Sequence, residues 1–123
     1  MSAKVLVVDD SALARRRMRE ILEAAGHEVM EAEEGMAAIE RYFLERPDLV
    51  LLDLVMKGMY GLDVLAKIRE IDPAARVIVV SADVQTTSKD LAVSGGAGWF
   101  ITKPPDRDEL VSAVTEALEG PRP

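Results

Sequence analysis

The fold is decided by Val5-Leu6-Val7-Val8-Asp9-Asp10, a run of four apolar residues that ends in two aspartates. Three further short runs along the chain also end in polar residues: Leu49–Leu52 before Asp53, residues 77–80 before Ser81, and Trp99–Thr102 before Lys103. Continuous apolar runs of this length are typical of strands that are covered on both faces of a parallel sheet. The carboxyl ends of such strands line the crevice where ligands bind. The pattern therefore predicts one site that combines three carboxylates, a hydroxyl and an ammonium.

Helical patterns alternate with these strands. After the first strand, Ala14, Met18, Ile21, Leu22 and Ala25 recur at helix spacing, and Gly26 supplies a stop. The later strands are predicted at 28–32, 48–52, 76–80 and 98–102. The helices between them are predicted to carry Ala38, Ile39, Tyr42 and Phe43 on the inner face of the first, and Leu62, Leu65 and Ile68 on the second, while the third, 84–94, is weaker. A last helix carries Leu110, Val111, Val114, Ala117 and Leu118. Five strand–helix units with right-handed crossovers predict a doubly wound α/β sheet, and residues 1–123 are expected to form one domain with no output domain attached.

Composition excludes several classes of function. The chain has 123 residues, of which 49% are apolar and 30% charged, a balance typical of a globular domain. It has no cysteine, which removes disulfides and thiolate sites, and no apolar run of membrane-spanning length. No signal peptide is visible, so a cytoplasmic location without a membrane partner is expected. The net charge of −7 argues against a nucleic-acid partner.

One basic cluster departs from this acidic balance. Arg15, Arg16 and Arg17 are consecutive, and Arg19 follows two positions later. The cluster fits a solvated helix face, and it also fits a docking edge for an acidic protein partner.

The acid pair after the first strand points to a metal ion. Adjacent carboxylates repel phosphate unless a cation lies between them, whereas a phosphate-cradling loop would carry glycines or a lysine there. Mg²⁺ prefers oxygen ligands and often takes one or two carboxylates together with phosphate oxygens. Asp10 and Asp53 are the expected direct ligands, with Asp9 close by. A single aspartate here would also fit a helix N-cap, a role that Ser11 can fill instead.

Asp53 is the central candidate of the predicted site. A carboxylate can attack phosphorus and form an aspartyl phosphate. The ammonium of Lys103 would neutralise charge on the transferred group, and the hydroxyl of Ser81 can donate to a phosphoryl oxygen. A structural ion pair between Asp53 and Lys103 is the alternative interpretation.

Two further residues bear on the site. The bond between Lys103 and Pro104 can be cis and so orient the lysine, although a simple turn before the last helix is the alternative. His27, the only histidine, is interpreted as structural.

Together these residues resemble the receiver domain of two-component response regulators, and the length is close to that of the single-domain chemotaxis type. The resemblance covers essentially the whole chain and rests on motifs in order: Val5–Ser11, Leu51-Leu52-Asp53-Leu54, Gly58-Met59-Tyr60-Gly61, Ser81-Ala82, Gly96-Ala97 and Lys103-Pro104. It implies a flavodoxin-like fold with strand order 2-1-3-4-5, for which a chemotaxis receiver is a known example.

The resemblance also implies roles for individual residues. Asp53 is the implied phosphoacceptor. Mg²⁺ is expected on Asp10, Asp53 and the backbone carbonyl of Val55, with Asp9 assisting through water. Lys103 is expected to contact the phosphoryl group. Ser81 and Phe100 are expected to act as the switch pair.

The implied function is that of a phosphorylation-operated switch. A histidine kinase or a histidine phosphotransfer protein would donate the phosphoryl group, and the protein would catalyse only its own phosphorylation and dephosphorylation. A downstream protein would bind a face formed by the fourth helix, the fifth strand and the fifth helix. Lys57 stands where the family usually has proline, and Pro105 where it usually has a hydrophobic residue. A small aspartyl-phosphate phosphohydrolase and a phosphorylation-independent scaffold remain as alternatives.

Overall fold

Strands and helices alternate along the chain without exception in the part that the structure describes. The computed structural model describes residues 2–82 and 86–120. Its elements are β1 (Lys4–Val8), α1 (Ala12–Ala24), β2 (Glu28–Ala32), α2 (Gly35–Glu45), β3 (Leu49–Leu52), α3 (Gly61–Ile71), β4 (Val77–Ser81), α4 (Thr86–Ser94), β5 (Trp99–Thr102) and α5 (Arg107–Glu119). The first two residues of the predicted helix 84–94, Val84 and Gln85, lie outside the described residues.

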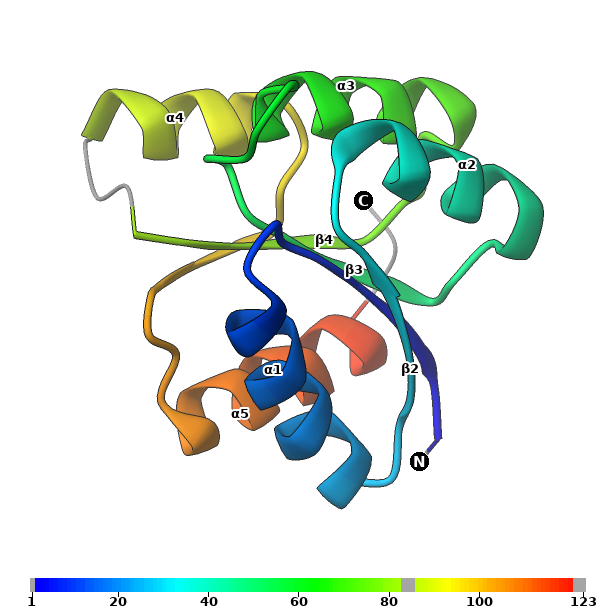
Figure 1. Ribbon diagram of the computed structural model, residues 1–123, viewed down its shortest axis with the longest axis vertical. Helices are drawn as coiled ribbons and strands as arrows, with labels where there is room; N and C mark the ends of the chain where they lie inside the picture. The colour runs from blue at the N-terminus through cyan, green and yellow to red at the C-terminus, as the bar shows by residue number, and fades with distance from the viewer. Residues whose placement is uncertain (1, 83–85, 121–123) are drawn as a thin grey trace.

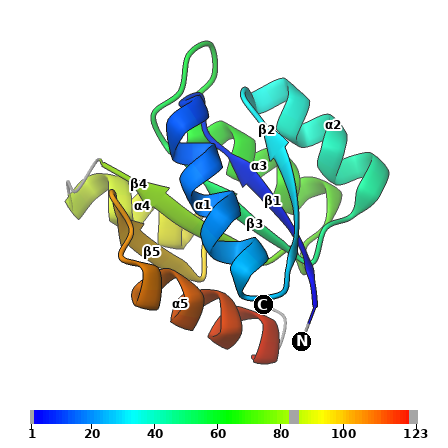
Figure 2. The same cartoon turned by 60° about the horizontal axis from the view of Figure 1, so that its bottom comes forward.

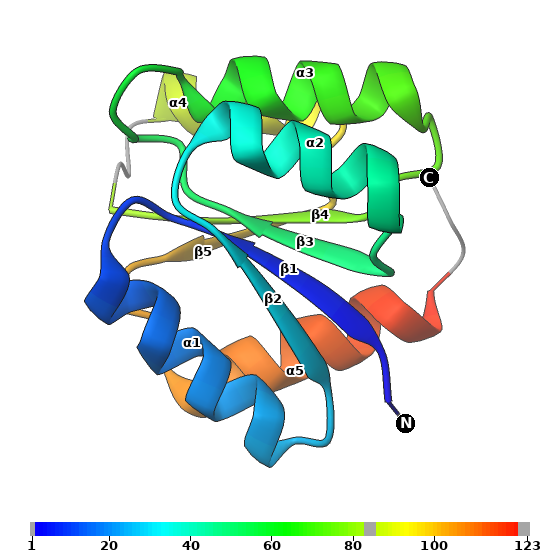
Figure 3. The same ribbon diagram turned by 45° about the vertical axis from the view of Figure 1, so that its right-hand side comes forward.

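The strands form one parallel sheet in the order β2-β1-β3-β4-β5. Helices α1 and α5 cover one face of this sheet, and α2, α3 and α4 cover the other (Figures 1 and 3). This doubly wound arrangement and its strand order confirm the predicted fold. Since all strands run the same way, the loops that follow β1 and β3 stand at the same end of the sheet (Figure 2).

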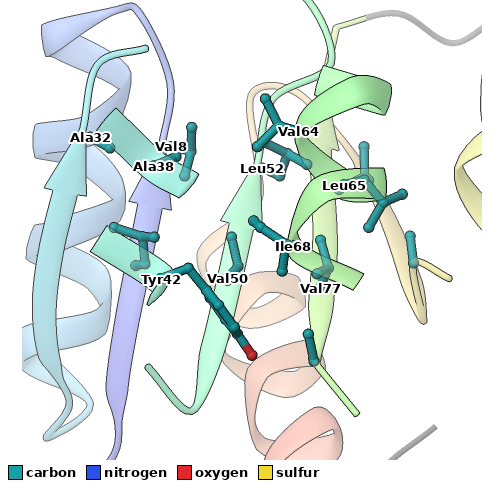
Figure 4. Close-up of a cluster of buried hydrophobic side chains, with 14 of the residues drawn as sticks. Val8, Ala32, Ala38, Tyr42, Val50, Leu52, Val64, Leu65, Ile68 and Val77 are labelled. Atoms are coloured by element: carbon teal, nitrogen blue, oxygen red, sulfur yellow. The ribbon is translucent and has the colours of Figure 1, made fainter. Parts of the chain in front are cut away.

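Each face of the sheet has its own buried apolar cluster. Because side chains alternate along a strand, Leu6 and Val8 of β1 join one cluster while Val5 and Val7 join the other. The first cluster lies under α2 and α3, where Tyr42 packs beside Val50 (Figure 4). The hydroxyl of Tyr42 donates to Asp72 Oδ2 at 2.8 Å, which satisfies the polar end of this buried ring.

The prediction of which residues form the inner face of α2 was partly wrong. Ala38 and Tyr42 are buried as expected, but Phe43 is 61% exposed and Ile39 is half-buried. Successive helix residues are about 100° apart, and on α2 Tyr42 points to the sheet while Phe43, the next residue around the helix, turns to solvent. The buried stripe consists of Gly35, Ala38 and Tyr42 instead.

No helix within residues 2–82 and 86–120 has both the length and the apolar character that crossing a bilayer requires.

Candidate functional site

Asp53 lies at the carboxyl end of β3, directly after four fully buried apolar residues. Only 5% of the residue is exposed. Its two carboxylate oxygens have different partners: the Val55 N–H donates to Oδ1 at 3.1 Å, and Lys103 Nζ donates to Oδ2 at 2.9 Å. The backbone N–H of Asp53 donates to the Val8 carbonyl of the neighbouring strand at 3.0 Å. The sheet therefore holds this carboxylate in a fixed position beside the end of β1.

Asp9 and Asp10 follow β1 and face the same point. Asp9 is fully buried, whereas Asp10 is exposed. Asp9, Asp10 and Asp53 each present a carboxylate oxygen, and these oxygens lie within 4.8 Å of one another. Asp9 Oδ1 accepts from the Ser11 N–H at 2.9 Å, and Asp10 Oδ2 accepts from the Lys57 N–H at 3.2 Å. The structure thus brings together the three acids that the sequence predicted to converge.

Ser11 takes the helix-capping role. Its side-chain oxygen accepts from the Ala14 N–H at 3.2 Å, at the first turn of α1. Neither acid is therefore needed as the N-cap of α1, and both remain turned to the cluster.

Lys103 reaches the acids from the end of β5. Its ammonium forms ion pairs with Asp53 Oδ2 and with Asp9 Oδ2. The Lys103 N–H donates to the Ser81 carbonyl at 2.9 Å, which joins β5 to β4 at this edge. The peptide bond between Lys103 and Pro104 is cis, as the sequence suggested.

The charge state of Lys103 reflects two opposing effects. Burial on its own would lower the pKa of Lys103, but hydrogen bonds and Coulomb attraction from Asp9 and Asp53 outweigh burial and raise the pKa above its ordinary value. The side chain therefore carries a full positive charge at neutral pH.

The predicted switch residues lie beside this cluster of charges. Ser81 is the last residue of β4 and is fully buried. Phe100 is half-buried in β5 and packs against the apolar cluster under α2 and α3. Trp99, its neighbour in β5, packs against the cluster on the other face. The two aromatic residues thus belong to opposite faces of the sheet, as strand alternation requires.

The loop after Asp53 is shaped by two glycines. Gly58 adopts a φ of 84°, a left-handed conformation that side chains rarely tolerate. At Gly61, an added Cβ would collide with the backbone of Asp53 and Leu54, so α3 begins in direct contact with the end of β3. Within this loop Val55 is 61% exposed, and Lys57 is also exposed.

The sequence did not reveal a hydrogen-bond network in which arginines of α1 hold the backbone of Asp9 and a glutamate of β2. Arg15 Nη1 donates to the Asp9 carbonyl at 2.7 Å, and Arg15 Nε donates to Glu31 at 2.9 Å. Arg19 Nε donates to the other oxygen of Glu31 at 2.6 Å. The side chain of Arg15 is only 12% exposed, so this residue does not lie on a solvated face. The network depends on the register in which β2 pairs with β1, where Val7 faces Glu31, and the arginine-rich stretch carries no signal for that register.

The other two arginines of the cluster differ from this pair. Arg16 is largely exposed and forms a surface ion pair with Glu20 at 3.2 Å. Arg17 lines a groove of about 690 Å³ that also contacts Leu13, Lys103 and Pro104. This groove lies between α1 and the loop before α5 and reaches Lys103 at the edge of the acid cluster. The prediction that the arginine cluster lies on a solvated helix face is therefore confirmed for Arg16 and wrong for Arg15.

The charge balance of the site is unequal. Three carboxylates share one ammonium, and two of those carboxylates are buried. A structural ion pair would need only one acid, so the cluster carries more negative charge than Lys103 neutralises. Oxygen ligands at this spacing suit a hard divalent cation, and the exposed Asp10 leaves the cluster open to solvent. The donor set therefore fits Mg²⁺.

His27 has no part in this arrangement. It is half-buried in the turn between α1 and β2, and burial lowers its pKa. Its Nδ1 is buried without a hydrogen-bond partner among the described residues.

Comparison with known proteins agrees with the geometry. A family model described as the response regulator receiver domain matches residues 5–115. The chemotaxis protein CheY of Bacillus subtilis is 40% identical over 119 residues, which cover 96% of this chain and 99% of that protein. Sporulation initiation phosphotransferase F of Bacillus subtilis is 37% identical and covers 96% of this chain and 95% of its own length. A solved CheX-CheY-BeF3-Mg2+ complex from Borrelia burgdorferi matches with a TM-score of 0.91 and 32% identity over 95% of this chain and 90% of that chain.

Proposed function

The chain belongs to the response regulator receiver domain family, and from this premise we propose that Asp53 is its phosphoacceptor. Lys103 and Ser81 would contact the transferred group. Mg²⁺ would be held by Asp10, Asp53 and the Val55 carbonyl, with Asp9 acting through water. When bound, the cation supplies charge neutralisation for the phosphoryl oxygens.

The observation that carries this proposal is the unequal charge around Asp53. Its carboxylate is almost fully buried, yet the Lys103 ammonium that pairs with it also pairs with Asp9. Asp10 follows β1 and Lys103 follows β5, on opposite sides of β3 in the sheet, so a phosphoryl group on Asp53 would have a cation available from the β5 side. Charge placed in advance around the reacting group is the main means by which proteins promote phosphoryl transfer.

The transfer is a substitution at phosphorus. An oxygen of Asp53 would attack the phosphorus of a phosphohistidine on the donor, so an O–P bond forms while the N–P bond breaks. The electron pair of that bond stays on the departing imidazole, which takes up a proton from solvent. Lys103 is already hydrogen-bonded to Asp53 Oδ2 and would keep a donor beside the new phosphoryl oxygens. The product is an acyl phosphate, which water can later hydrolyse.

Phosphorylation would be read out through the far edge of the sheet. Ser81 ends β4 and Phe100 lies in β5, and the two strands pair directly. A hydroxyl drawn to the phosphoryl group would leave room for Phe100 to turn inward, which would change the surface formed by α4, β5 and α5. In physical terms, phosphorylation shifts the balance between two conformations. A downstream protein that binds one of them receives the signal.

The donor we propose is a histidine kinase or a histidine phosphotransfer protein. It must reach Asp53 at the carboxyl ends of the strands, where the groove beside α1 leads to Lys103. Leu13 and Arg17 give that groove an apolar and basic lining, which suits contact with a protein. The related complex from Borrelia burgdorferi, whose components include CheX, BeF3 and Mg2+, supports both the metal and a protein as the downstream partner. Nucleic acid is not expected as a partner, given the net charge of −7.

Phosphoryl uptake tests the proposal. The protein is incubated with acetyl phosphate and Mg²⁺, and the intact mass is followed with time. We expect one phosphoryl group per chain in the wild type, none in Asp53→Asn, and normal uptake in the control Asp63→Asn, whose aspartate lies exposed on α3. Continuous turnover of a small phosphate ester would instead indicate a phosphohydrolase. No uptake by the folded wild-type protein would indicate a scaffold and contradict the proposal.

A further inference from the structure

Helix α2 has a second apolar face that the core does not use. Met36 is 65% exposed, Phe43 61% and Leu44 68%. Single exposed apolar side chains are ordinary, but three large ones on one helix of eleven residues form a patch. Phe43 was expected inside from its sequence position, and the core excludes it because Gly35, Ala38 and Tyr42 already fill the inner face.

This patch is hollowed into a groove. Met36, Ile39 and Phe43 of α2 and Ile71 at the end of α3 line a space of about 490 Å³, and Glu34 and Glu40 stand at its rim. We call this the α2 groove. A second hollow of about 340 Å³ lies next to it, shares Ala37 and Glu40 with it, and contains Leu44. Figure 3 shows α2 on the outside of its helical layer, with no other element in front of it.

The charge around the α2 groove is acidic. Neither Glu34 nor Glu40 forms an ion pair within the described ranges of the chain. The basic residue nearby, Arg41, is paired with Glu45 at 2.7 Å, so its charge is already neutralised. An apolar floor with an unneutralised acidic rim complements a partner that carries apolar and basic residues together.

We propose that the α2 groove binds a basic amphipathic helix of another protein. Met36 and Phe43 are seven residues apart, which places them two turns, or about 10.5 Å, along the same side of α2. A helix lying along α2 presents its own apolar residues at the same spacing, and grooves of this kind are a common way to hold amphipathic helices. Lysine or arginine residues that flank the apolar stripe of the partner would meet Glu34 and Glu40.

Charge disfavours the other occupants. A second copy of this chain carries the same net charge of −7 and the same acidic rim, so two α2 grooves repel each other. The cytoplasmic surface of a membrane is anionic and would repel the rim as well.

Binding at the α2 groove is expected to be independent of phosphorylation. Helix α2 follows β2 at one edge of the sheet, whereas Phe100 lies in β5 at the other edge. The α2 groove would therefore act as a constant attachment point, separate from the face that reads the phosphorylation state.

A fluorescent peptide tests this proposal. The probe is an amphipathic peptide in which leucine recurs every third or fourth residue and lysine fills the remaining positions, and its control is the same composition in scrambled order. Binding to the full chain is measured by fluorescence anisotropy, and the site is mapped by amide chemical shifts. We expect Phe43→Ser to weaken binding at least tenfold and Glu40→Lys several-fold. The matched controls Tyr60→Ser and Glu28→Lys, at exposed positions that do not line the α2 groove, should stay within twofold of wild type. Beryllofluoride with Mg²⁺ should leave the affinity unchanged.

Several outcomes would overturn the proposal. Equal binding of the scrambled peptide, unchanged binding by Phe43→Ser, or shifts that map to α1 would each do so. Sedimentation showing a dimer that Phe43→Ser abolishes would assign the groove to a second copy instead. Flotation with phosphatidylserine vesicles that depends on Phe43 would assign it to a membrane. Because Phe43 is largely exposed, its variant should fold, which urea denaturation checks.

Discussion

Replacing Lys103 by methionine tests the charge balance of the acid cluster. The methionine side chain is one atom shorter and unbranched like that of lysine, and the change removes the ammonium from Asp9 and Asp53, both of which are buried. Removing one partner from a buried ion pair costs about 3–5 kcal/mol, because the remaining charge is left uncompensated. Lys103 itself is 18% exposed, so water can reach the vacated position. We therefore expect the free energy of unfolding without metal to fall by about 3 kcal/mol, the lower end of that range.

The same change should strengthen metal binding. Lys103 Nζ lies 2.9 Å from Asp53 Oδ2, and an Mg–O bond is about 2.1 Å, so the ammonium and a cation on that same oxygen are at most about 5 Å apart. Because Mg²⁺ carries two charges, their repulsion at that distance is about 2 kcal/mol in bulk water and about 7 kcal/mol at the effective dielectric constant of a protein surface. Since a factor of ten in affinity corresponds to about 1.4 kcal/mol, even the bulk-water value predicts that Lys103→Met binds Mg²⁺ at least about tenfold more tightly than the wild type.

Urea denaturation and calorimetry measure the two effects. Unfolding is followed by the fluorescence of Trp99, the only tryptophan, in EDTA and in Mg²⁺, and the Mg²⁺ affinity is measured by titration calorimetry. Lys67→Met is the matched control, because Lys67 is 58% exposed and makes only a surface pair with Glu70 at 3.5 Å. Its stability should change by less than about 0.5 kcal/mol. A loss of less than about 1 kcal/mol in Lys103→Met, or an Mg²⁺ affinity that is unchanged or weaker, would show that Lys103 does not balance the charge of the buried acids.

Three other substitutions test separate parts of the structure. Gly61→Ala should destabilise the protein by about 1–3 kcal/mol, because the new methyl group collides with the backbone of Asp53; a chemical denaturation midpoint equal to wild type would contradict the close packing. Arg15→Ala removes hydrogen bonds to the loop after β1 and to a glutamate of β2, so it should cost about 1–3 kcal/mol of stability, while the exposed Arg16→Ala should cost almost nothing; equal losses would argue against the network. His27 has a lowered pKa, so the unfolded chain binds its proton more readily, and stability is lost as the pH falls below 6.5. His27→Gln should remove that part of the pH dependence in denaturation measured across this range, and an identical pH profile would show that His27 does not contribute.

The fold was predictable because its signals are local. Each strand is a short apolar run that ends in a polar residue, and Asp9, Asp53, Ser81 and Lys103 all lie where those runs placed them. The strand order could not be predicted in this way, because the apolar runs do not specify which strands are neighbours in the sheet. That order came from the family resemblance, and it is what brings Lys103 to Asp53 across fifty positions of the chain.

The parts that sequence reasoning missed depend on contacts between distant elements. The link from Arg15 to Glu31 requires the register of β2 against β1, which an arginine-rich stretch does not reveal. The orientation of Phe43 required knowing that small residues and Tyr42 fill the inner face of α2. Helical spacing placed Phe43 on the same face as its neighbour Tyr42, whereas in the structure only Tyr42 is buried.

Chemical trapping of the phosphorylated protein identifies the residue that receives the phosphoryl group, which we propose is Asp53. The wild-type protein is treated with acetyl phosphate and Mg²⁺ and then with sodium borohydride, which reduces an aspartyl phosphate to homoserine, and its peptides are sequenced by mass spectrometry. We expect homoserine at position 53 and at no other aspartate, and none when EDTA replaces Mg²⁺. Homoserine at position 9 or 10, or a fully phosphorylated protein that yields no homoserine, would contradict this assignment.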